Sequence, residues 1–351
     1  MLLKELSNAR GVSGNEVAVR DILRQAVVGM VDECSVDALG NLICLKKART
    51  SPSSPAAPKR VLVAAHMDEV GLIITGLNGD GTLRYAKVGG IDDRMLLSKQ
   101  VLVGEKAVPG VIGFRPIHLI GRAGTEKLAD MSQTAIDIGA SSKEAAAKLA
   151  QPGDYVTFRT DFGMLSEEGL RTAKGKALDD RVGCAELVEA LKGDYAFDVF
   201  AVFTTQEEVG SRGARVAGYR INPDIAIVLE GTVCDDLPKE RDRDLSPVTE
   251  LGKGPVISFR DGTVVCDRRL VKLLSSTAES LGIPYQYRRL VTAGTDAGAL
   301  HLVREGVPAV VLSVPCRYIH APVSVVSLSD YDYAVKLLMA ALAKLEGGLQ
   351  A

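Results

Sequence analysis

The segment RVLVAAHMD (60–68) constrains the fold of this chain more than any other. Five apolar residues follow one another without a polar interruption, and the run then ends in histidine, methionine and aspartate. A strand with one face in water alternates polar and apolar residues, so this unbroken run predicts a central strand buried on both faces. Such a strand requires helices on both sides of its sheet.

Apolar strands and helical segments alternate through the C-terminal half of the chain. The expected strands are DVFAVFTT (198–205), DIAIVLEG (224–231) and PAVVLSV (308–314). The expected helices are RVGCAELVEALK (181–192), RRLVKLLSSTAESLG (268–282) and a terminal helix from Ser329. This alternation predicts an α/β fold with a mostly parallel sheet and helices on both faces.

A different pattern separates the first apolar strand from this series. Between residues 71 and 168, short alternating strands such as GLIITGL and QVLVGE lie among glycines, with one helical patch at 141–149. This pattern predicts a small β-rich domain. We therefore expect residues 1–70 and 169–351 to form one α/β domain, with residues 71–168 inserted into it.

Two local patterns lie near the N-terminus. The motif SGNE (13–16) is typical of a capping box and predicts a helix from there to about Gly29. The stretch ARTSPSSPAAPK (48–59) is rich in proline and serine, which predicts an exposed loop or hairpin before the first apolar strand.

The composition excludes several classes of protein. The 351 residues are 46% hydrophobic and 25% charged with a net charge of −2, and no basic run offers a footprint for nucleic acid. No apolar stretch is long enough for a signal sequence or a membrane span. Six scattered cysteines without a CxxC pair are typical of reduced thiols. We expect a soluble, cytoplasmic protein.

Polar side chains follow the apolar runs at five points. These are His66-Met-Asp68, Asp179-Asp180, Glu207-Glu208, Glu230 and His320. In open α/β sheets, functional groups collect where strands end and loops begin. Each point alone has a simpler explanation, such as a hydrogen-bonded surface pair or a solvated turn, so the argument depends on their joint occurrence.

Adjacent acids at the end of an apolar strand repel one another unless a cation lies between them. Two imidazoles with several carboxylates form a mixed nitrogen and oxygen set that suits zinc first, and also cobalt or manganese. One carboxylate bridging two ions gives the two-metal arrangement that aminopeptidases use. In the HxD motif, Asp68 can hold the far ring nitrogen of His66 and so define its tautomer.

Five motifs, in order, closely resemble the tetrahedral or deblocking aminopeptidases, which are metallopeptidase family 42. They are AHMDEVGLIIT, KALDDRVGCAELVEAL, FTTQEEVGSRGA, GTDAG and RYIHAPVSVVSLSD. The resemblance covers nearly the whole chain, and some members of the family carry an endoglucanase label. It implies two divalent ions per chain, short peptide substrates, and dimers that assemble into a hollow twelve-subunit tetrahedron. The insert would then be a contact or gating surface.

The resemblance also implies a role for each metal-compatible side chain. His66 and Glu230 complete one metal site, while Glu208 and His320 complete the other. Asp179 bridges the two ions. At the position of Glu230 the family often has aspartate, and Asp235 and Asp236 lie nearby in the sequence as alternative ligands; we favour Glu230 because it directly ends DIAIVL.

Further roles follow from the same resemblance. Glu207 is the general base that deprotonates the metal-bridging water and passes the proton to the leaving amine. Asp68 orients His66, and a non-proline cis peptide joins Asp179 to Asp180. The GTDAG loop lines the substrate pocket with Gly294, Thr295 and Asp296, although a tight turn alone explains these glycines equally well.

Arg260 and Arg317 are candidate partners of an acidic substrate side chain. Ordinary salt bridges at the surface or in the core are the more usual role of such arginines, so neither is assigned to the site.

Other activities fit less well than the expected two-metal aminopeptidase. A glycoside hydrolase needs two carboxyl groups about 5 Å or more apart across the scissile bond, and this chain has no Trp and only 5% aromatic residues. A non-enzymatic scaffold is expected to lose the base, yet Glu207 is present. A metal-dependent amidase or deacylase acting on non-peptide amides stays open, because its metal chemistry is the same.

Overall fold

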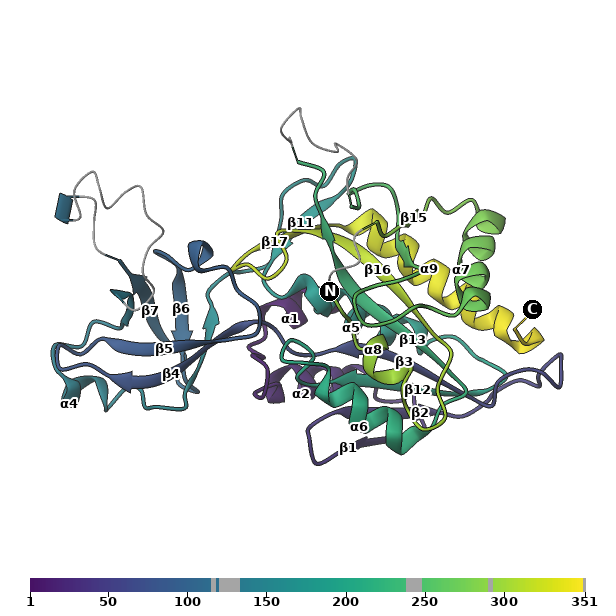
Figure 1. Cartoon of the computed structure of the whole chain (residues 1–351), viewed down its shortest axis with the longest axis horizontal. Coiled ribbons are helices and arrows are strands. Elements are labelled where there is room, and N and C mark those ends of the chain that lie inside the picture. The colour runs from purple at the N-terminus through teal and green to yellow at the C-terminus, as the bar shows by residue number, and fades with distance from the viewer. Residues whose placement is uncertain (115–117, 120–132, 238–247, 290–292, 350–351) are drawn as a thin grey trace.

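The computed structural model describes residues 1–114, 118–119, 133–237, 248–289 and 293–349. An α/β part with an eleven-stranded sheet carries a smaller closed barrel that projects from one side (Figure 1). The predicted fold class is therefore confirmed. No helix within the described ranges is long and apolar enough to cross a membrane.

Four parallel strands form the centre of the large sheet. In spatial order they are β12 (Asp198–Thr204), β3 (Arg60–His66), β13 (Ile225–Cys234) and β16 (Ala309–Arg317). Strand β3 is the predicted RVLVAAHMD strand, and it is buried between β12 and β13. Its last residue, His66, pairs in register with Thr204 of β12.

Antiparallel strands extend this parallel centre on both sides. One edge consists of β1 (Glu33–Val36) and β2 (Leu42–Lys46). The other edge consists of β17 (Ser324–Ser327), β11 (Thr172–Gly175) and β10 (Gly163–Met164), and the short β14 (Val256–Ser258) and β15 (Gln286–Tyr287) attach to β16. The mostly parallel sheet is thus confirmed where the sequence shows unbroken apolar runs.

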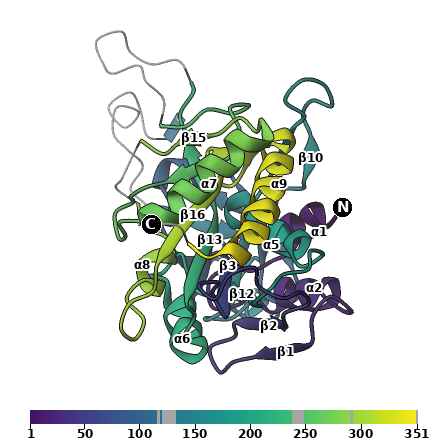
Figure 2. The same ribbon diagram turned by 90° about the vertical axis from the view of Figure 1, so that its right-hand side faces the viewer.

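Helices cover the two faces of the sheet (Figure 2). On one face α5 (Leu178–Ala190) packs on β13 and β3 and contacts α9 (Leu328–Lys344), which in turn contacts α7 (Arg268–Leu281). The short N-terminal helices α1 (Leu2–Asn8) and α2 (Val17–Ala26) join this layer. On the other face α6 (Arg212–Ile221) packs on β12 and contacts α8 (Ala297–Leu300). A 3-10 turn, Leu345–Gly347, follows α9.

The N-terminal helix differs from the capping-box prediction. Helix α2 begins at Val17 without a side-chain cap and ends at Ala26, short of Gly29. The hydroxyl of Ser13 donates to Asp68 Oδ2 at 2.6 Å instead of capping the helix. The predicted helix is present, but the capping box is not, because the Ser13 hydroxyl donates to a buried carboxylate distant in sequence and accepts no N–H of the helix.

The insert forms a closed six-stranded barrel with its own apolar core. The strands close in the order β4 (Gly71–Leu77), β5 (Leu83–Val88), β8 (Ala135–Asp137), β7 (Val108–Gly113), β6 (Gln100–Val103) and β9 (Tyr155–Phe158). Leu72, Val101 and Ile112 are fully buried inside it. The expected helical patch is the short α4 (Lys143–Ala146), and a 3-10 turn (Asp93–Met95) follows β5. The barrel lies between β3 and β10 in the chain, so one connection leaves the end of β3 and the other leads to the edge strand β10.

Candidate active site

The carboxyl ends of the parallel strands bring the predicted polar side chains together. His66 ends β3, Glu230 lies in β13, and the pair Glu207-Glu208 follows β12. They line one cavity of about 300 Å³ together with Asp179 and His320. Parallel strands end at the same edge of a sheet, so residues that are distant in sequence meet there.

Two groups of metal-compatible side chains lie in this cavity. The first consists of His66, Asp179 and Glu230, and the second of Asp179, Glu208 and His320. Within each group the donor atoms lie within 4.8 Å of one another. His66 Nε2 lies 3.2 Å from Glu230 Oε1 and 3.3 Å from Asp179 Oδ1. The first group is thus compact and almost completely buried.

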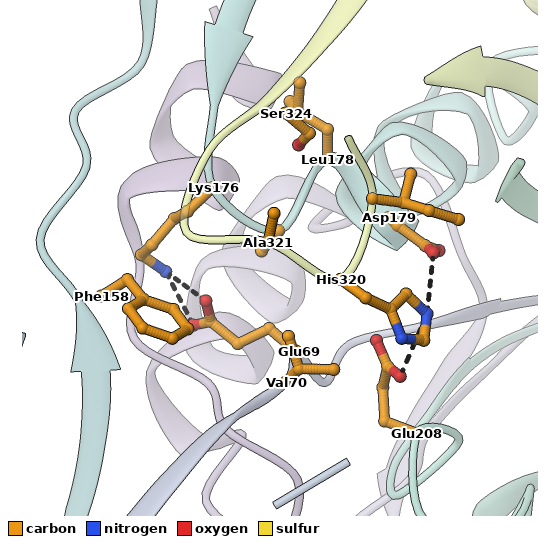
Figure 3. A pocket seen from close by; sticks show the side chains of 12 residues that line it. Glu69, Val70, Phe158, Lys176, Leu178, Asp179, Glu208, His320, Ala321 and Ser324 are labelled. Atoms are coloured by element: carbon orange, nitrogen blue, oxygen red, sulfur yellow. Dashed lines mark hydrogen bonds and ion pairs between the residues drawn. The ribbon is translucent and has the colours of Figure 1, made fainter. Parts of the chain in front are cut away.

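Asp179 belongs to both groups through different oxygens. Its Oδ1 faces His66, and its Oδ2 lies 3.6 Å from His320 Nε2. His320 Nε2 also lies 3.5 Å from Glu208 Oε2, and Figure 3 shows this imidazole between the two carboxylates. A carboxylate that shares its two oxygens between two donor groups has the arrangement required of a bridging ligand.

The ring nitrogens of both histidines are oriented by backbone carbonyls. His66 Nδ1 lies 3.1 Å from the carbonyl oxygen of Asp68, and His320 Nδ1 lies 2.9 Å from the carbonyl oxygen of Gly90. A carbonyl oxygen only accepts, so Nδ1 carries the proton in each neutral ring and the lone pair of Nε2 faces carboxylate oxygens. The Nε2 lone pair and the carboxylate oxygens repel one another unless a cation lies between them. In metal-bound histidines the nitrogen that does not bind the metal commonly donates to a backbone carbonyl, as Nδ1 does here.

The donor set therefore fits divalent metal ions. Asp179 Oδ1 is buried and accepts no hydrogen bond, which leaves it available as a ligand atom. Burial raises the pKa of Glu230 and of Glu208 well above the usual value, and the neighbouring charge of Asp179 acts in the same direction. A bound cation relieves this crowding of like charges, and two imidazoles with carboxylates form a donor set that zinc accepts.

Asp68 ties the first histidine to the loop that follows β12. Its Oδ1 accepts from the backbone N–H of Glu207 at 2.9 Å, and its Oδ2 accepts from that of Glu208 at 3.1 Å. Its Oδ1 also lies 3.5 Å from His66 Nδ1. Burial alone would raise the pKa of Asp68, but the hydrogen bonds from His66, from the Ser13 hydroxyl and from the backbone of Glu207 outweigh it and lower the pKa. Asp68 therefore stays ionised and holds three site residues in place.

Comparison with known proteins identifies the family. The sequence profile of the M42 glutamyl aminopeptidases matches residues 40–337. The chain belongs to the M42 glutamyl aminopeptidase family. Over 356 aligned residues it is 34% identical to the lysyl aminopeptidase of Pyrococcus furiosus, covering 98% of this chain and 97% of that protein.

Solved structures share the fold of this M42 aminopeptidase over its whole length. The TET aminopeptidase of a marine sediment archaeon of the Thaumarchaeota superposes with a TM-score of 0.91 at 32% identity, covering 99% of this chain and 98% of that one. The Pyrococcus horikoshii TET1 peptidase superposes with a TM-score of 0.83 at 35% identity, covering 97% and 98%. The chain is accordingly a hydrolase of peptide bonds, and the metallopeptidase family implies the use of divalent metal.

The carboxylates that flank the metal-compatible groups have distinct environments in this M42 aminopeptidase. Burial, with the charges of Asp296 and Glu208 acting in the same direction, raises the pKa of Glu207 to about 8. Glu207 Oε1 accepts from the hydroxyl of Ser211 at 3.3 Å. Asp180 follows Asp179 across a cis peptide bond, and its Oδ2 accepts from the backbone N–H of His66 at 3.0 Å. Asp180 thus anchors the end of β3.

The other predicted positions lie at different distances from the site. Gly294 and Thr295 line the cavity. Asp296 is almost fully buried and is not among the lining residues, because its Oδ2 accepts from the hydroxyl of Thr204 at 2.6 Å. The alternative ligand Asp236 forms a salt bridge with Arg317 at 2.6 Å and belongs to neither metal-compatible group. Asp235 accepts a hydrogen bond from the backbone of Val248 and also belongs to neither.

A buried ion-pair network adjoins the site and was not predicted from the sequence. Lys176 Nζ lies 2.7 Å and 2.9 Å from the two carboxylate oxygens of Glu69, as Figure 3 shows. Glu69 Oε1 also accepts from the hydroxyl of Thr157 in the barrel strand β9 at 3.3 Å. Glu69 follows Asp68, and Lys176 precedes Asp179 by three residues. The network therefore connects the barrel to the two segments that carry His66 and Asp179.

Proposed function

We propose that this M42 aminopeptidase uses two divalent metal ions and Glu207 as its general base. His66 and Glu230 would hold one ion, Glu208 and His320 the other, and Asp179 both. The observation that carries this proposal is the position of Asp179, whose two oxygens face separate groups of donors. Zinc suits the mixed nitrogen and oxygen ligands, and cobalt or manganese can replace it in such a set.

Two divalent ions in such a site polarise the scissile carbonyl and lower the pKa of water. Glu207 lies in the same cavity but belongs to neither metal-compatible group, so its carboxylate is available for proton transfer. It takes the proton of the attacking water and delivers it to the leaving amine. Asp68 supports this step, because its hydrogen bond to the backbone of Glu207 holds the base next to His66.

A free N-terminal amine is the feature that separates an aminopeptidase from an amidase with the same metals. The substrate amine is cationic, and the cavity is lined by carboxylates that attract it. We expect a short peptide with a free N-terminus to be trimmed one residue at a time, while its N-acetylated twin resists. Mass spectrometry of timed digests measures both rates. Equal rates for the two peptides would favour the amidase or deacylase instead.

We further propose that the barrel serves assembly and that the enzyme works in the cytoplasm. None of the proposed metal ligands comes from the barrel, although the carbonyl oxygen of Gly90 orients His320. The Pyrococcus horikoshii TET1 peptidase is described as assembling into a tetrahedron or a large octahedral shell. Six free cysteines, five of them buried, suit a reducing compartment.

Assembly predicts a mass far above that of one chain. Twelve chains of 37.2 kDa in a closed shell would admit short or unfolded peptides and exclude folded proteins. Light scattering coupled to gel filtration is expected to give the twelve-chain mass. The matched control is a variant in which a short linker replaces the barrel residues 71–158. Its mass should not exceed that of a dimer. A fully active monomer of the intact chain would refute the shell and leave the metal site unaffected.

A further inference from the structure

Arg288 is a buried arginine in the wall of the active-site cavity. It follows the short strand β15, whose position is marked in Figure 1, and its backbone N–H donates to the carbonyl oxygen of Ile257 in β14. Only 3% of the residue is exposed, yet it lines the same cavity as His66, Asp179 and Glu207. Its guanidinium is thus held at the site rather than in bulk solvent.

The guanidinium of Arg288 has no partner of its own among the described residues. Its Nε is buried without a hydrogen bond, and no carboxylate in that part of the chain forms an ion pair with it. Arg181, the other deeply buried arginine near the site, donates through Nε to the carbonyl oxygen of Met67 and through Nη1 to that of Leu6. Arg317 pairs with Asp236. Arg288 therefore differs from Arg181 and Arg317, whose guanidinium groups have hydrogen-bond or ion-pair partners.

None of the four carboxylates that line the cavity pairs with Arg288. Asp179 and Glu230 face His66, Glu208 faces His320, and Glu207 accepts from the Ser211 hydroxyl. A buried charge without a partner is strongly unfavourable, and unpaired charges of this kind gather at functional sites where a ligand completes them. A planar guanidinium fork matches the geometry of a carboxylate through two parallel hydrogen bonds.

A second unpartnered donor lines the same cavity. Thr232 Oγ1 is buried without a hydrogen bond, and Thr232 lies two residues after Glu230 on β13. Residues two apart in a strand share a face, so its hydroxyl lies on the same side of the strand as the Glu230 carboxylate. A cavity of about 300 Å³ is at the small end of ligand sites and suits one or two residues of a peptide.

We propose that Arg288 binds a carboxylate of the substrate, with the Thr232 hydroxyl as a further donor. This rests on the proposed function. In a peptide that carboxylate comes from one of two sources. It is the side chain of an N-terminal Asp or Glu, or it is the C-terminal carboxylate of a dipeptide. Either source makes Arg288 a specificity-determining residue that the sequence motifs do not single out.

Two matched pairs of compounds distinguish the sources. Glutamyl-anilide and glutaminyl-anilide differ only in the side-chain carboxylate, while Leu-Ala and Leu-Ala-amide differ only in the terminal carboxylate. We expect the wild-type enzyme to prefer the anionic member of one pair by about 10- to 10²-fold in kcat/KM, as for a hydrogen-bonded charge pair. The pair that shows the preference identifies the source.

Substitution then assigns the preference to one side chain. Arg288→Gln should reduce that ratio to near one, and Arg288→Lys should retain part of it because the charge stays without the fork. Arg289→Gln is the matched control, since Arg289 is the next residue, is exposed and does not line the cavity. Thermal unfolding and metal content verify that each variant is folded and loaded.

The outcomes separate this inference from the proposed function. If leucyl-anilide is cleaved but neither pair shows a preference, or if Arg288→Gln leaves the preference intact, the inference is wrong and the aminopeptidase stands. If no compound is cleaved, the proposed function fails. The same four compounds then serve as ligands in calorimetric titration of the zinc-loaded wild type and Arg288→Gln, where equal affinities within each pair would overturn the role of Arg288.

Discussion

Glu207→Gln is expected to lower kcat by about 10²- to 10⁴-fold while both metal ions stay bound. The amide keeps the size of the side chain and its contact with the Ser211 hydroxyl, but it cannot accept the proton of the attacking water. Because Glu207 belongs to neither metal-compatible group, its loss should leave metal affinity nearly unchanged. Steady-state kinetics on a leucyl-anilide and elemental analysis of the same preparation measure the two effects.

The adjacent residue offers a matched comparison for this variant. Glu208→Gln is the same chemical change one residue later, and Glu208 does belong to the second metal-compatible group. An amide oxygen is a weaker ligand than a carboxylate, so this variant should lose one ion under mild chelation and regain activity when metal is added. The opposite pattern, with metal lost from Glu207→Gln and retained in Glu208→Gln, would exchange the roles of the two residues.

The sequence predicts the centre of the fold because of one physical constraint. A strand buried on both faces must be apolar at every position, so RVLVAAHMD and DIAIVLEG are recognisable without an alignment. Their parallel pairing then places His66 and Glu230 at the same edge of the sheet. The meeting of these polar residues could be predicted because it follows from strand direction alone.

Residues that support the site could not be predicted in the same way. Ser13 and Glu16 match a capping box, and nothing local shows that the Ser13 hydroxyl donates to Asp68 instead. The contact of Gly90 with His320 joins the insert to a loop 230 residues later, through a carbonyl group that every residue has. Such contacts depend on the packing of the barrel against the sheet and leave no side-chain signal.

The arginines illustrate the same limit. Arg260 and Arg317 are the candidate substrate contacts in the sequence, and no sequence pattern marks Arg288 as a third. In the structure Arg260 is exposed and Arg317 pairs with Asp236, while Arg288 is buried in the cavity wall. Its burial results from the short strands β14 and β15, which are too brief for a recognisable sequence pattern.

Asp179→Ala is expected to remove both metal ions and to lower activity by at least about 10³-fold, because it removes the one carboxylate shared by both groups. Wild-type protein loaded with zinc should carry close to two ions per chain by elemental analysis. The variant should retain well under one ion after brief dialysis against a weak chelator.

The control for this variant is a carboxylate from outside the cluster. Asp236→Asn removes a negative charge close in sequence to Glu230, and this residue is the alternative ligand suggested by the family pattern. Because Asp236 pairs with Arg317 and belongs to neither metal-compatible group, this variant should keep both ions. If Asp179→Ala retained one tightly bound ion, Asp179 would serve a single metal and would not bridge. If Asp236→Asn lost an ion instead, the ligand assigned to Glu230 would be wrong.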